Sequence, residues 1–187
     1  MKKEKKEKKR AEVGNFSGEM LELINQVRAN PASFSQKILD AIPLIRKDEK
    51  TGKLIFETNG VKVSLARGED AFRAAAEVLQ KIKPGLPLQM KEELNIPVLE
   101  NPDDWNNNEK MIQLLKEKKK VLDDQDLTFN MDKGNTDPAS SLLCQIIDDS
   151  AFKGKRRDNI FNPEHRYIAI SFLQSGKKFC CYLTFSK

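Results

Sequence analysis

The C-terminal segment 166–185, RYIAISFLQSGKKFCCYLTF, constrains the fold of this chain more than any other feature. Two runs of alternating side chains, 166–173 and 178–185, flank the turn signal Ser175-Gly176, which predicts a two-stranded hairpin. Each strand collects apolar residues on one face: Ile168, Ile170 and Phe172 in the first, and Phe179, Cys181, Leu183 and Phe185 in the second. An isolated hairpin is only marginally stable, so these strands must pack on helices. The sequence therefore predicts an α+β fold with a small antiparallel sheet.

The helices expected to cover this sheet are runs in which apolar residues recur at helical spacing. These runs begin near Gly18 and stop at Pro31, begin again at Pro31 and reach Ile42, and then span 69–83, 109–122 and 140–149. Residues 48–66 differ, because LIFET and VKVSL alternate like strands beside the turn signals Thr51-Gly52 and Asn59-Gly60. We interpret 48–66 as a hairpin inserted at the surface, 96–108 as a loop, and 123–137 as a polar, turn-rich segment.

Composition places the chain among soluble globular proteins with one domain. It has 187 residues, of which 39% are hydrophobic and 33% are charged, and no apolar run approaches the length of a membrane span. The first residues, MKKEKKEKKR, lack the apolar stretch of a secretory signal. Three cysteines, two of them adjacent, fit reduced thiols better than a disulfide framework. We therefore expect an intracellular, cytoplasmic protein.

The positive charge is concentrated at the N-terminus. Residues 2–10 hold seven basic residues against two glutamates, a net charge of +5 that equals the net charge of the whole chain. We expect 1–14 to be a basic, disordered or extended tail and 15–187 to be the folded domain. Such a tail binds acidic partners through weak contacts that salt screens, although it also suits a leader that only aids solubility. No aromatic residue interleaves the lysines, and the rest of the chain is formally neutral, so nucleic acid is the less favoured partner.

Four pieces of the chain, in order, resemble the CAP superfamily (the SCP-like domain of cysteine-rich secretory, antigen 5 and pathogenesis-related-1 proteins), in particular its protist and bacterial branch. They are MLELINQVRANPASF (20–34), PGLPLQMKEELN (84–95), LTFNMDKGNTDPASSLLCQIIDD (127–149) and RRDNIFNPEHRYIAISFLQSGKKFCCYLTF (156–185). The resemblance implies an α-β-α sandwich. It also implies a cleft in which two histidines and one or two glutamates hold a divalent metal or act in hydrolysis.

The site residues implied by this resemblance are missing from the chain. The histidine of the family's closing motif falls on Arg156, with Arg157 and Asn159 retained, and the glutamate of its strand motif falls on Phe129. A guanidinium does not release its proton in a protein, and a phenyl ring has no acceptor. We therefore expect a degenerate site with no catalytic residue, metal or cofactor. The only histidine, His165, follows the turn that starts the hairpin, so we expect a surface or strand-start role for it.

The basic run Lys155, Arg156 and Arg157 allows two interpretations. In the structural one, Arg156 or Arg157 pairs with the aspartates that end the preceding helix, Asp148 and Asp149. In the functional one, the run forms a basic rim for an acidic partner. Trp105 is a second contact candidate, and a local cap over the core explains it equally well.

The leading hypothesis is a non-catalytic CAP-like structural protein that binds an acidic macromolecular partner, for which a microtubule lattice of the cytoskeleton or cilium is our suggestion. Its candidate contact residues are Lys2, Lys3, Lys5, Lys6, Lys8, Lys9, Arg10, Trp105, Lys155, Arg156 and Arg157. One alternative is a divergent CAP-type hydrolase, which requires His165 to meet a carboxylate of Glu92, Glu93, Glu100 or Glu109. Another is a lipid or sterol carrier with an open apolar groove near the first two helices.

Overall fold

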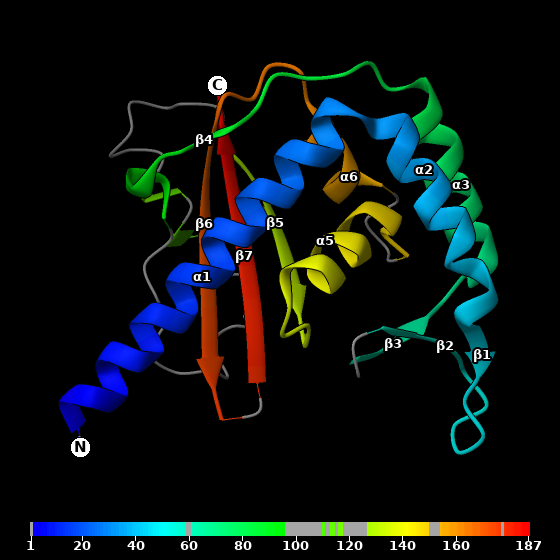
Figure 1. The fold of residues 1–187 in the computed structure, drawn as a ribbon, viewed down its shortest axis with the longest axis horizontal. Helices are drawn as coiled ribbons and strands as arrows, with labels where there is room; N and C mark the ends of the chain where they lie inside the picture. The colour runs from blue at the N-terminus through cyan, green and yellow to red at the C-terminus, as the bar shows by residue number, and fades with distance from the viewer. Residues whose placement is uncertain are drawn as a thin grey trace.

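The computed structural model describes residues 2–58, 61–95, 110, 113, 114, 116, 117, 127–149, 154–176 and 178–187, with the side chains of 2–14, 58, 61 and 178 outside that description. Its helices and a four-stranded sheet form one core. A three-stranded sheet, at the end of the molecule away from the N-terminus, adds side chains to the same core (Figure 1). The predicted α+β fold is confirmed. None of the helices in the described ranges has the length and apolar character of a membrane span.

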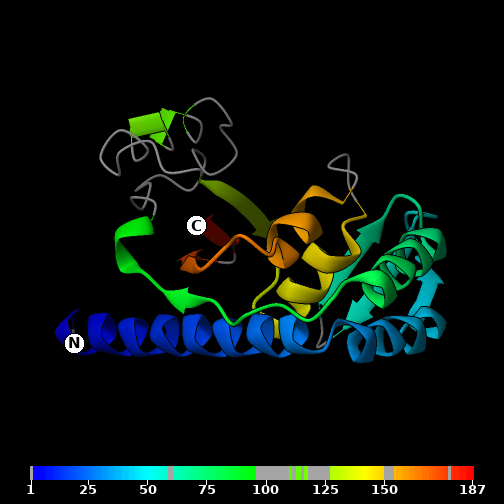
Figure 2. The ribbon, with the colours of Figure 1, turned by 90° about the horizontal axis from the view of Figure 1, so that it is seen from above.

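Helix α1 spans Lys2–Ala29, so it begins far before Gly18. We expected a disordered or extended segment up to residue 14, whereas the helix runs through it without a break. Lysine, glutamate, arginine and alanine are among the best helix formers, and they make up most of this segment. Figure 2 shows α1 as one long rod along a side of the molecule, with the N-terminus at its outer end.

The C-terminal half of α1 packs on the four-stranded sheet. Met20 and Ile24 are fully buried, and Phe16 stacks on Phe172 of the sheet with ring centroids 4.1 Å apart. After α1 the chain turns at Asn30, whose side chain accepts a hydrogen bond from the Ser33 N–H, as the first residues of α2 require. The apolar stripe of α1 therefore fixes one layer of the core.

Two helices, α2 (Pro31–Asp40) and α3 (Glu69–Lys81), pack side by side at the end of the molecule away from the N-terminus (Figure 1). Both were predicted from their apolar spacing. The Ser35 hydroxyl donates to the Ala76 carbonyl across the pair, at 2.9 Å. A short 3-10 turn, η1 (Ile42–Leu44), then leads from α2 into the small sheet.

The small sheet contains the predicted hairpin and one additional strand. Its order is β1 (Ile45–Lys47), β2 (Leu54–Thr58) and β3 (Val61–Leu65), all antiparallel. Its inner face belongs to the core, because Phe56 is buried and meets Phe72 of α3 edge-on. Residues 48–66 are thus part of the core and not only an insertion at the surface. The Asn59-Gly60 turn signal lies outside the described residues.

The larger sheet has the strand order β4-β6-β7-β5, built from β4 (Gln89–Met90), β5 (Thr128–Lys133), β6 (Tyr167–Ser175) and β7 (Lys178–Ser186). The predicted hairpin is β6 and β7, in which Ile170 pairs with Leu183. Strand β5 was not predicted. Its inward positions include the polar residues Asn130 and Asp132, both buried, so the segment resembled a polar turn rather than a strand.

Helices α5 (Pro138–Ile147) and α6 (Lys155–Phe161) lie beside β5 (Figure 1). The Asp137 carboxylate caps α5 by accepting from the Ser140 N–H at 2.9 Å. On the larger sheet, Leu173, Cys180 and Tyr182 form a second apolar cluster, and Leu114 packs against it. Most of 109–122 and all of 96–108 lie outside the described residues, so the helix and loop expected there, and with them the α-β-α layering, remain predictions.

Candidate functional site

The position where the resemblance implies a histidine holds an arginine that forms a buried ion pair. Arg156 Nε lies 2.7 Å from Asp148 Oδ1, and the Arg156 N–H donates to the other carboxylate oxygen at 3.1 Å. Asp148 is fully buried and ends α5 in a left-handed conformation (φ 48°). This confirms the structural interpretation of the basic run.

The same helix also covers the outer edge of β5. Arg156 Nη1 donates to the Met131 carbonyl at 3.3 Å, and Asn159 Nδ2 donates to the Phe129 carbonyl at 3.3 Å. In the reverse direction, Asn130 Nδ2 donates to the Arg156 carbonyl at 2.8 Å. Arg156 and Asn159 share a face of α6 because they are three residues apart, and the Phe129 and Met131 carbonyls point to the same edge of β5 because they are two apart. The two side chains therefore reach the two carbonyls together. Arg156 and Asn159 thus close an edge of the sheet.

The basic run does not form a continuous exposed rim. Lys155 is exposed, but Arg157 is 8% exposed and its Nη1 donates to the Ile146 carbonyl at 3.0 Å. Gly154 has a φ of 95°, and a Cβ there would lie 2.6 Å from the Arg157 guanidinium. Among these three residues, Lys155 is the one that a partner reaches freely.

The two positions to which the resemblance assigns a histidine and a glutamate line different hollows. Phe129 is 37% exposed and borders a shallow hollow of about 320 Å³ together with Lys155 and Asn159. Arg156 borders a separate pocket of about 430 Å³ between β5 and β3. Neither side chain offers a group that ligates a metal or takes up a proton. In the described ranges, no cluster of three or more His, Cys, Asp and Glu side chains is placed to hold a metal ion.

His165 is a buried, hydrogen-bonded residue. Its ring stacks on Phe185, its Nδ1 lies 2.9 Å from the Asn159 carbonyl, and its Nε2 lies 3.3 Å from both Thr128 Oγ1 and Asn162 Nδ2. A carbonyl only accepts, so Nδ1 carries the proton and Nε2 accepts. Burial lowers the pKa of His165 and favours this neutral form.

The carboxylates of the hydrolase alternative are placed as follows. Glu92 and Glu93 are exposed on the 3-10 turn η2 (Glu92–Leu94), whereas His165 is 2% exposed. Glu100 and Glu109 lie outside the described residues, as does Trp105. His165 is thus a strand-start residue inside the core rather than the surface residue that was the other expectation.

Arg28 is a buried residue whose role the sequence analysis missed. It is 1% exposed, and its guanidinium donates to the carbonyls of Leu86 at 2.9 Å, of Asn162 at 3.2 Å and of Ile160. It therefore ties the end of α1 to the end of α6 and to the segment that leads into β4. Its position in the sequence could have indicated this role, because Arg28 follows Val27 on the apolar stripe of α1, where a charged residue is unusual.

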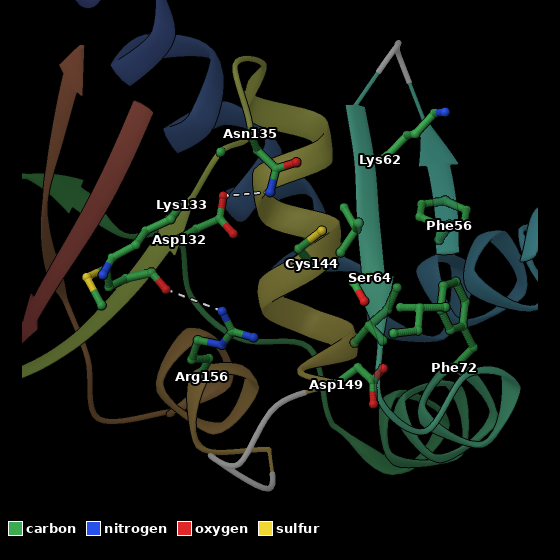
Figure 3. Close-up of a pocket in the computed structure, with 15 residues that line it drawn as sticks. Phe56, Lys62, Ser64, Phe72, Asp132, Lys133, Asn135, Cys144, Asp149 and Arg156 are labelled. Carbon is green, nitrogen blue, oxygen red and sulfur yellow. Dashed lines mark hydrogen bonds between the residues drawn. The ribbon is translucent and has the colours of Figure 1, made fainter. Parts of the chain in front are cut away.

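Two titratable groups with raised pKa values, Asp132 and Cys144, line the pocket of about 430 Å³ (Figure 3). Burial raises the pKa of Asp132 to about 6, despite hydrogen bonds from Asn135 and Ser141. Burial also raises the pKa of Cys144 to about 12, so its thiol stays protonated and is a poor nucleophile near neutral pH. The arrangement offers hydrogen-bond acceptors rather than a reactive group. All three cysteines of the chain are free thiols.

Comparison of the chain with protein-family models, with curated proteins and with solved structures found no match in any of the three. The resemblance to the CAP superfamily therefore rests on the four sequence pieces alone.

Proposed function

We propose that this protein is a non-catalytic CAP-like binding protein whose basic N-terminal helix docks on an acidic macromolecular surface. The partner that we propose is an acidic protein lattice such as a microtubule, in the cytoplasm or a cilium. The observation that carries the proposal is the continuity of α1, which places the seven basic residues of 2–10 on the same helix as the buried stripe of the core. A basic segment held in this way has one orientation relative to the domain.

The sequence positions give the basic helix a defined side. A helix turns by about 100° per residue, so positions that are 18 residues apart share a face. Positions 2, 6 and 9 therefore line up with Met20, Ile24 and Val27, which are buried in the core. The glutamates at positions 4 and 7 fall on the opposite side. A partner is expected to lie against the outer turns of α1, on the side that continues the buried stripe.

The composition of the degenerate site supports binding rather than catalysis. Arg156 is bound to Asp148 and to the edge of β5, and Phe129 has no polar group. His165 uses both ring nitrogens in contacts within the core. These residues favour the non-enzymatic function over the hydrolase alternative.

The test is co-sedimentation with stabilised microtubules at increasing salt. We compare the full chain with a variant that lacks residues 1–10 and with one in which Lys2, Lys6 and Lys9 are glutamine. Binding is expected to weaken with salt and to fall in both variants, because each lysine contributes a screened contact. Binding that does not depend on salt or on these residues contradicts the proposal, and stronger retention on DNA than on microtubules assigns a different partner.

Alanine insertions that rotate residues 2–10 about the axis of α1 test whether the orientation of the basic residues matters. Two alanines inserted after Gly14 rotate positions 2–10 by about 200° at unchanged charge, whereas seven alanines keep the orientation within about 20°. The first insertion is expected to weaken binding and the second to retain it. Equal binding by both insertions shows that charge alone acts and contradicts the oriented helix.

A further inference from the structure

The pocket of about 430 Å³ lies between a strand of the small sheet and a strand of the larger sheet. One wall is β3, with Ser64 and Leu65, and the other is the end of β5 with α5 (Figure 3). Its size is that of small-ligand sites, which are commonly about 300–1,000 Å³. Apolar side chains line part of it: Phe56, Val63, Leu65, Phe72, Met131 and Ile147.

One buried amide in this pocket has an unused acceptor. Asn135 is 3% exposed, and its Nδ2 donates to Asp132 Oδ2 at 2.8 Å. This bond fixes the orientation of the amide, and Asn135 Oδ1 is buried without a hydrogen-bond partner among the described residues. Figure 3 shows that oxygen turned away from Asp132, on the side of the pocket toward β3. A buried acceptor left unpaired costs roughly 1–3 kcal/mol, so a donor entering the pocket is stabilised there.

The neighbouring carboxylate adds negative charge to the same place. Asp132 is 6% exposed, and the turn at Gly134 (φ 91°) folds the chain so that Asn135 returns to it. Three basic side chains also line the pocket, Lys62, Lys133 and Arg156, and the Nε of Arg156 is bound to Asp148. Asp132 and Asn135 therefore present two acceptors side by side.

We propose that this pocket binds a small organic cation, a primary amine whose ammonium group donates to Asp132 and to Asn135 Oδ1 while its aliphatic body lies against the apolar wall. An ammonium carries three donors and no acceptor, which matches two converging acceptors. Hydrogen bonds between ionised groups are about twice as strong as neutral ones, so a charged amine binds better than an alcohol of the same shape. This site is separate from the basic helix and does not depend on the function proposed for it.

The test uses butylammonium as the probe, with 1-butanol as the neutral analogue and butyrate as the anionic one. Backbone amide signals of the full chain are followed by NMR during titration with each. Butylammonium is expected to shift the signals of residues 132–135 and of β3 in a saturable manner, and the other two are not. Equal shifts with butanol, or no saturable shift with butylammonium, overturn the proposal.

Two variants separate binding from folding. Asp132→Asn keeps the size of the side chain, and its loss of charge is expected to weaken butylammonium binding roughly tenfold to a hundredfold. Ser64→Trp fills the pocket from an exposed position on β3 and leaves Asp132 and Asn135 unchanged, and it is expected to abolish binding. Ser175→Trp, at an exposed strand serine outside the pocket lining, is the matched control and keeps full affinity. Undiminished binding by Ser64→Trp overturns the site.

Discussion

Replacing Arg28 with methionine tests the most heavily bonded buried side chain of the fold. Methionine has a similar length and no donors, so the substitution removes the hydrogen bonds to Leu86, Ile160 and Asn162 while it fills most of the space. Gly85 lies against the same guanidinium, with a hypothetical Cβ 3.4 Å from it, so the chain is closely fitted there. Two segments that are distant in sequence, around Leu86 and at 160–162, thereby lose a common donor.

The magnitude follows from these three acceptors. A buried carbonyl that loses its donor, as Ile160 would, costs roughly 1–3 kcal/mol, and the part-buried carbonyls of Leu86 and Asn162 cost less. Part of this is offset, because burial disfavours the charged guanidinium, as the lowered pKa of Arg28 indicates. We expect Arg28→Met to reduce the free energy of unfolding by about 3–5 kcal/mol, a large part of the 5–15 kcal/mol typical of a domain. Arg28→Lys retains one charge but not the planar fork, and we expect a loss of about 2 kcal/mol.

Urea unfolding followed by far-UV circular dichroism measures these values. The matched control is Arg73→Met, because Arg73 is a helical arginine whose ion pair with Glu69 is exposed, and its loss is expected to cost at most about 0.5 kcal/mol. If Arg28→Met costs no more than Arg73→Met, the carbonyl contacts of Arg28 contribute little to stability. The reasoning is also refuted if Arg28→Lys is the more harmful of the two changes.

Two further predictions concern backbone conformation and pH. Gly68 has φ 60°, and a Cβ there would lie 2.6 Å from Leu54 Cδ1. Gly68→Ala is therefore expected to reduce the free energy of unfolding, measured by thermal unfolding, by about 2 kcal/mol. The control Gly18→Ala, in open space on α1, is expected to be neutral or stabilising. The pKa of Asp132 is raised from 3.8 to about 6, so the folded state binds this proton more tightly, and the carboxyl makes the free energy of unfolding fall as pH rises from about 4 to about 6. Asp132→Asn removes that slope, and its stability relative to the wild type is expected to rise by up to about 3 kcal/mol over this range. The lowered pKa of His165 has the opposite effect, because stability is lost as pH falls below about 6.5. Both the wild type and Asp132→Asn contain His165, so its contribution cancels in the difference between them. A difference that stays constant from pH 4 to 7 contradicts the assignment to Asp132.

The parts of the fold that the sequence predicted are those specified by local patterns. Ile168, Ile170 and Phe172 alternate along β6 and all enter the core, so the period of two is visible within one segment. Helix α3 is equally clear, because its apolar residues recur at helical spacing. In both elements, the residues that face the core are apolar, which is the condition under which periodicity indicates structure.

The parts that the sequence did not predict depend on partners far away in the chain. Asn130 faces inward on β5, and its side chain donates to the carbonyl of Arg156, 26 residues along the chain, which no local pattern identifies. The pocket has the same origin, because its two walls come from β3 and β5. A charged residue on an apolar stripe, such as Arg28, was the one local sign of such long-range bonding.

The contacts of Arg156 explain why an arginine occupies the position that the resemblance assigns to a histidine. Its guanidinium joins Asp148 at the end of α5 to the Met131 carbonyl on β5, and Asn159 on the same face bonds the Phe129 carbonyl. These contacts require a donor at each of the two positions, three residues apart, and they require no proton transfer. The edge of β5 would otherwise present free carbonyls to solvent or to another strand. The need to close a sheet edge thus accounts for Arg156 and Asn159.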